Sequence, residues 1–145
     1  MQESILPWQT AKYLTMTSAL FFTSAIYSYY CRLYFLAGIS ALTSFISVNF
    51  WRKPEPSLRR EIDLIYSKLS FMIYFYNGVV YVRSLPYMLV FYPGLGVMLC
   101  CFYLSNQRYS QKKDDWWKYH FCFHLMVLVT QLAIIHNKWH FLQTV

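Results

Sequence analysis

Two histidines and one aspartate are the residues of this chain best suited to chemistry. His120 and His124 are spaced i, i+4, so both imidazole rings project from one face of a helix that carries them. Two neutral imidazoles and a carboxylate are a good ligand set for zinc, with water in the fourth position. Asp63 is the carboxylate that could complete the set. The pattern predicts a metal site formed by Asp63, His120 and His124, provided that the fold brings them together.

A structural role is the alternative that we favour for the same three residues. The histidine pair could hydrogen-bond to Asp63, to tyrosine hydroxyls or to lipid phosphates at the membrane interface. Asp63 itself could form an ion pair with Lys68, Arg59 or Arg60. Either arrangement would satisfy the polar groups without any chemistry.

The other two histidines repeat the same spacing near the end of the chain. His136 and His140 flank Trp139, and we interpret them as part of an interfacial tail. All four histidines fall on the last predicted helix or its extension. Ligation of haem by two histidines requires facing helices, which argues against a b-type haem within one chain. Zinc is therefore the one cofactor that the sequence suggests.

The elements that must position these residues are membrane-spanning helices. A helix needs about 20 apolar residues to cross about 30 Å of hydrocarbon, and only helices or closed barrels satisfy their backbone groups there. Hydrophobic residues make up 57% of the chain and charged residues 13%. We predict an all-α polytopic membrane protein with one domain, residues 1–145. Its five apolar stretches are residues 13–30, 33–51, 62–82, 85–104 and 119–135.

Several other classes of protein are disfavoured. The first nine residues contain Glu3 and no basic residue, so the first apolar stretch is read as a retained helix rather than a signal peptide. The four cysteines form no CxxC pair, which disfavours a disulfide framework or a thiolate metal site. The net charge of +7 resides in the loops, so we expect contact with lipid headgroups and no nucleic-acid binding.

The basic residues predict an orientation. Short cytoplasmic or matrix loops carry an excess of Lys and Arg, and the predicted connections alternate in charge. Arg32, Arg83 and Lys138 fall on one side. Nine basic residues fall on the other, namely Lys12, Arg52, Lys53, Arg59, Arg60, Arg108, Lys112, Lys113 and Lys118. We therefore expect the N-terminus inside and the C-terminus outside.

This orientation predicts that several polar residues lie at a similar depth. The second stretch ends on the basic side, and the third and fifth begin there. Asn49, Asp63, His120 and His124 should therefore lie near that one face. In the fourth stretch, Pro93 removes a backbone donor, so we expect a kink or break within residues 92–96.

Serines on an early helix, an Asp at the start of the next and a late His-x-x-x-His resemble the alkaline ceramidase and adiponectin-receptor superfamily of membrane hydrolases. The resemblance implies a zinc ion near the cytoplasmic face that activates water against an amide. Asp63 would match the acidic position and His120 and His124 the late pair. Ser44 or Ser47 is the nearest match to the family's serine.

This chain departs from that family in two respects. The family's third zinc ligand is a histidine on the early helix, where this sequence has Asn49-Phe50-Trp51 and no histidine precedes His120. The family also has seven helices. A second resemblance, carried by residues 47–54 and 59–63, is to uncharacterised small membrane proteins of protists and large viruses. It implies no known chemistry.

The incomplete catalytic set favours a non-catalytic function. We expect an accessory or structural subunit of a larger membrane complex, in contact with lipids and with other membrane subunits. A respiratory complex or the ATP synthase of the mitochondrial inner membrane is the assembly type that we favour. A zinc-dependent lipid amide or ester hydrolase is the first alternative. A small transporter or channel is the second, although the sequence has no internal repeat.

Overall fold

The computed structural model describes residues 4–144, and this part of the chain folds into five helices. The prediction of an all-α fold is confirmed, and each predicted stretch lies largely within one helix. The helices are α1 (Trp8–Tyr30), α2 (Tyr34–Trp51), α3 (Leu58–Tyr81), α4 (Leu85–Ser110) and α5 (Trp116–Thr144).

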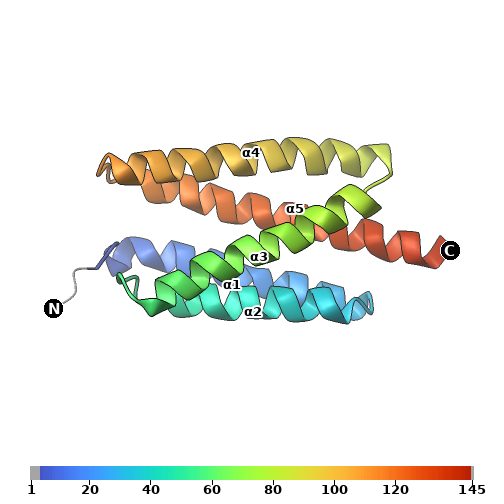
Figure 1. The fold of residues 1–145 in the computed structure, drawn as a ribbon, viewed down its shortest axis with the longest axis horizontal. Helices are drawn as coiled ribbons and strands as arrows, with labels where there is room; N and C mark the ends of the chain where they lie inside the picture. The colour runs from blue at the N-terminus through green and yellow to red at the C-terminus, as the bar shows by residue number, and fades with distance from the viewer. Residues whose placement is uncertain (1–3, 145) are drawn as a thin grey trace.

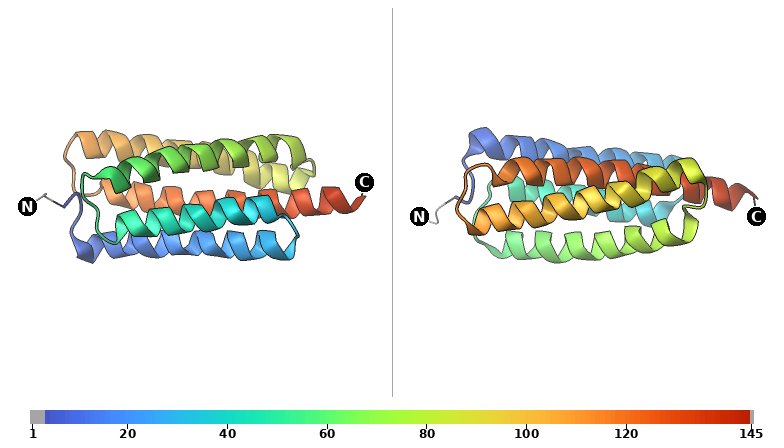
Figure 2. Two further views of the ribbon diagram at one scale, coloured as in Figure 1. Left: turned by 60° about the horizontal axis from the view of Figure 1, so that its bottom comes forward. Right: turned by 90° about the horizontal axis from the view of Figure 1, so that it is seen from above.

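Two antiparallel hairpins and one crossing helix make up the bundle. α1 packs most extensively on α2, and α4 packs most extensively on α5. α3 crosses obliquely from the α1–α2 pair to the start of α4 (Figure 1). α5 joins the two hairpins, because it also contacts α1 and α3. The N-terminus and C-terminus lie at opposite ends of the bundle, and α5 extends beyond the other helices at the C-terminal end (Figure 2).

The prediction of five membrane-spanning helices is met only in part. Within residues 4–144, three helices are long and apolar enough to cross a membrane: α2, α4 and α5. These three are compatible with an integral membrane protein. α1 and α3 are long enough but too polar, since α1 carries many Ser and Thr residues and α3 has four charged residues among its first six. Hydroxyl groups of α1 such as those of Ser18 and Ser24 are fully buried, so this polarity faces other helices.

We expected a kink or break in the fourth stretch, and the helix there is not broken. α4 is one continuous helix from Leu85 to Ser110, with Pro93 inside it. Pro93 is exposed on the outer face of the bundle, whereas Gly94 beside it is buried against Thr130 of α5. The small residue allows α4 and α5 to approach closely at this point.

Two of the connections, α1–α2 and α4–α5, use a residue with left-handed backbone geometry. Arg32, two residues after the end of α1, has φ 59°, and Lys112, two residues after the end of α4, has φ 54°. In each case the next residue donates its N–H to a carbonyl five residues earlier, from Leu33 to Ser28 and from Lys113 to Arg108. This is the Schellman arrangement that closes a helix C-terminus, usually with glycine at that position.

The core consists of two apolar clusters, one toward each end of the bundle. The cluster near the N-terminus contains Leu6, Ala11, Leu14, Phe50, Trp51 and Trp116. The cluster toward the opposite end contains Cys31, Leu33, Leu36, Tyr74, Val82, Phe91, Ile134 and Ile135. Many side chains buried between them are polar, and the candidate site lies in this middle section.

Candidate functional site

The structure brings His120 and His124 together in the first turns of α5. Their ring centroids are 4.8 Å apart, as the i, i+4 spacing predicts. Trp51 at the end of α2 packs against both, with its ring centroid 5.1 Å from that of His120 and 6.3 Å from that of His124. The indole fills space beside the pair that a third ligand would need.

Each histidine of the pair has a hydroxyl partner. Thr17 Oγ1 lies 2.9 Å from His124 Nδ1, and Ser105 Oγ lies 3.3 Å from His120 Nδ1. Thr17 has a single hydroxyl proton, and the carbonyl of Leu14 lies 3.1 Å from the same oxygen. When the proton goes to that carbonyl, His124 must donate from Nδ1. These contacts join α5 to α1 and to α4, and the partners are Thr and Ser hydroxyls rather than the Asp63, tyrosine or phosphate groups that we expected.

Asp63 is buried near the start of α3 but does not complete a metal site with the histidines. Among the described residues, no group of three or more His, Cys, Asp and Glu side chains could hold a metal ion. Asp63 is 7% exposed, its carboxyl group lies beside the Ser47 hydroxyl, and its Oδ1 has no hydrogen-bond partner within residues 4–144. The predicted set of Asp63, His120 and His124 is therefore divided into a pair and a separate carboxylate.

The alternative ion pairs of Asp63 are also not formed. Lys68 is exposed on the outer face of α3, whereas Asp63 faces inward. Arg59 pairs instead with Glu55, at 3.6 Å. Because residues five apart lie on different faces of a helix, the sequence separation of Asp63 and Lys68 already disfavours their contact.

The two serines suggested by the hydrolase resemblance connect α2 to α1. Ser44 Oγ donates to the backbone carbonyl of Ser18 at 2.9 Å. Ser47 Oγ lies 3.0 Å from Ser18 Oγ. Both serines are buried, and only Ser47 lies beside Asp63. Asn49, expected at the same depth, is partly exposed.

The histidine pair near the C-terminus also has a packing role. His136 Nδ1 lies 2.6 Å from the Tyr27 hydroxyl, and its ring also packs against Tyr87. His140 is exposed, with its ring centroid 4.4 Å from that of His136. The interpretation as an interfacial tail therefore fits His140 better than His136, which joins α5 to α1.

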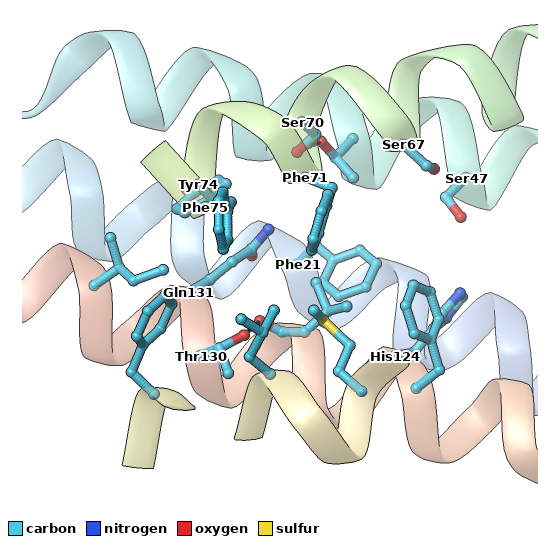
Figure 3. Close-up of a pocket in the computed structure, with 17 residues that line it drawn as sticks. Phe21, Ser47, Ser67, Ser70, Phe71, Tyr74, Phe75, His124, Thr130 and Gln131 are labelled. Carbon is cyan, nitrogen blue, oxygen red and sulfur yellow. Dashed lines mark hydrogen bonds between the residues drawn. The ribbon is translucent and has the colours of Figure 1, made fainter. Parts of the chain in front are cut away.

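A cavity of about 60 Å³ lies at the centre of the bundle and was not predicted. All five helices contribute to its wall, and Figure 3 shows the side chains that line it. Its polar lining comes from Thr43 and Ser47 of α2, Ser67, Ser70 and Tyr74 of α3, and His124, Thr130 and Gln131 of α5.

Gln131 is the polar residue of this cavity that most needs a partner. It is 3% exposed, and its Oε1 has no hydrogen-bond partner within residues 4–144. The side chain extends from α5 toward the side chains of α3 (Figure 3). Buried polar groups are nearly always hydrogen-bonded, so an acceptor left open in a cavity indicates that the cavity takes up a donor.

The sequence contained a signal for this polar interior. The polar residues of α3 are spaced alternately by four and three, at Asp63, Ser67, Ser70, Tyr74 and Asn77. Those of α2, at Ser40, Thr43, Ser44 and Ser47, also include pairs three and four residues apart, such as 40/44 and 44/47. Such spacing places each set on one face of its helix.

Comparison of the chain with protein-family models, with curated proteins and with solved structures gave no match.

Proposed function

We propose that this chain is a non-catalytic accessory subunit of a larger membrane complex. The observation that supports it is a groove on the outer face of the α1–α2 hairpin. Small residues form its floor, and larger aromatic and aliphatic side chains form its walls. It is lined by Phe22, Ala25, Ile26, Tyr29, Tyr30, Tyr34, Ala37, Gly38 and Ala41.

The groove has the lining expected of a contact surface for another membrane helix. Its volume of about 720 Å³ far exceeds that of the central cavity. A Cβ atom added at Gly38 would meet no atom within 4 Å, so the floor is open there. Small residues let helix backbones approach closely in membranes, where packing rather than the hydrophobic effect drives association. Tyr29 and Tyr34, with ring centroids 5.5 Å apart, form one end of the groove.

The orientation and the location remain part of the proposal. The N-terminus, the α2–α3 loop and the α4–α5 loop lie at the same end of the bundle (Figure 2), and these segments together with the helix turns next to them carry most of the basic residues. We infer that this end faces the cytoplasm or the mitochondrial matrix. A respiratory complex or ATP synthase of the mitochondrial inner membrane stays the assembly type that we favour, and cell fractionation tests it.

Native gel electrophoresis in mild detergent tests the subunit proposal. The wild-type chain is expected to migrate with a complex far larger than 17.5 kDa. Gly38→Leu fills the groove and should release the chain as a free species. Gly96→Leu is the matched control, since Gly96 is also open, with nothing within 4 Å, but lies on α4. A wild-type chain that migrates as a free monomer contradicts the proposal.

A further inference from the structure

The polar groups of the bundle interior continue on both sides of the central cavity. Toward the basic end, Ser47 lines the cavity and lies beside Asp63. Toward the other end, Tyr74 also lines the cavity, and its hydroxyl lies 2.5 Å from Ser40 Oγ. Ionisable residues inside a membrane bundle are costly and commonly mark the routes of ions or protons.

The end of this polar series is a lysine. Asn77 follows Tyr74 by one turn on the same face of α3, and it is buried. Lys138 Nζ of α5 donates to Asn77 Oδ1 at 2.6 Å. On α5, His124, Gln131 and Lys138 are spaced by seven residues, so they lie along one stripe of the helix. Asp63 and Asn77 are 14 residues apart, which corresponds to about 21 Å along a helix.

We propose that the interior of the bundle forms a proton-conducting path that runs from Asp63, through the central cavity at Gln131, to Lys138. A cavity of about 60 Å³ has room for a few water molecules, since one water needs about 10–15 Å³ of such volume. Water there can donate to the open Gln131 Oε1 and bond to the hydroxyls of Ser47 and Tyr74.

The chemistry of the lining favours protons over other cargo. Hydroxyl, imidazole and water each donate and accept hydrogen bonds, so a proton can enter on one side of such a group and leave on the other, whereas the amides of Gln131 and Asn77 orient the neighbouring donors. The cavity is too small for an organic solute. Within the described residues, no cluster of three His, Cys, Asp or Glu side chains is available to hold a metal ion.

The test measures proton uptake into liposomes that contain the purified full-length chain. A potassium diffusion potential set by valinomycin drives the uptake, and a pH-sensitive dye inside the vesicles reports it. We expect wild-type vesicles to acidify at least tenfold faster than protein-free vesicles. Asp63→Asn and Gln131→Leu should each lower the rate at least tenfold, and Asp63→Glu should retain it.

Matched controls separate the path from a nonspecific leak. Glu61→Gln alters an exposed carboxylate two residues from Asp63, and Gln107→Leu alters an exposed glutamine of α4. Both should keep the wild-type rate. Gly38→Leu should also keep it, because the groove lies outside the path, so failure of the subunit proposal would not affect this result. Should Asp63→Asn not fold, Gln131→Leu carries the test.

Three results would overturn the proposal. The first is a wild-type rate equal to that of protein-free vesicles. The second is an acidification rate equal to that of the wild type in folded Asp63→Asn or Gln131→Leu protein. The third is a current that depends on sodium or potassium rather than on the proton gradient.

Discussion

Lys138 Nζ donates a hydrogen bond to Asn77 Oδ1 at 2.6 Å, which joins the C-terminal half of α5 to the last turns of α3. The same ammonium group lies 4.5 Å from the centroid of the Tyr81 ring. Asn77 in turn donates to the carbonyl of Ile73. One half-buried cation is thus held by an amide oxygen and by an aromatic face, both from α3.

We expect Asn77→Leu to destabilise the protein more than Lys138→Met. Loss of Asn77 leaves the ammonium group without its acceptor, at a cost of about 1.5–3 kcal/mol, whereas Lys138→Met removes the charge itself. SDS titration in detergent micelles measures the free energy of unfolding of both variants. The double variant should lose less free energy of unfolding than the sum of the two single losses. Strictly additive losses would show that the contact contributes nothing.

Gly78→Ala should destabilise the contact between α3 and α4. A Cβ atom there would overlap the end of the Phe91 ring, which is 2% exposed and has little room to move. Overpacking of this kind costs about 1–3 kcal/mol. Gly38→Ala is the matched control, because its Cβ would lie in open space and alanine is the better helix former. Thermal unfolding in detergent should therefore give a lower midpoint than wild type for Gly78→Ala and a higher midpoint for Gly38→Ala.

Arg32→Gly should stabilise the turn between α1 and α2. Arg32 has φ 59°, a geometry that costs a non-glycine residue about 1 kcal/mol or more and glycine very little. Arg32→Val should destabilise it, since a β-branched side chain suits this region least. Equal unfolding midpoints for the wild type and both variants would contradict this account. Lys112→Gly, with the same geometry before α5, should behave like Arg32→Gly.

Purified protein should contain far less than one zinc ion per chain. The histidine pair has Trp51 beside it, and no third ligand joins it among the described residues. Metal analysis by mass spectrometry after dialysis against zinc measures this, and His124→Ala serves for comparison. One zinc per chain that is lost in His124→Ala would instead support the hydrolase alternative.

The number and order of the helices could be read from the sequence, because each apolar stretch is as long as a membrane is thick. The pairing of His120 with His124 was equally readable, since i, i+4 contacts lie within one helix. The helix boundaries were less certain: α5 continues to Thr144, beyond the predicted end at residue 135, because residues 136–144 mix polar and aromatic side chains and carry no clear hydropathy signal.

The sequence by itself determined an all-helical chain with apolar spans and one local histidine pair. Only the tertiary structure decided that Asp63 faces Ser47 rather than the histidines, and that Gln131 opens into a cavity. Hydropathy depends on which residues follow one another along the chain. The meeting of side chains from different helices depends instead on how each helix is rotated about its axis, and packing against neighbours sets that rotation.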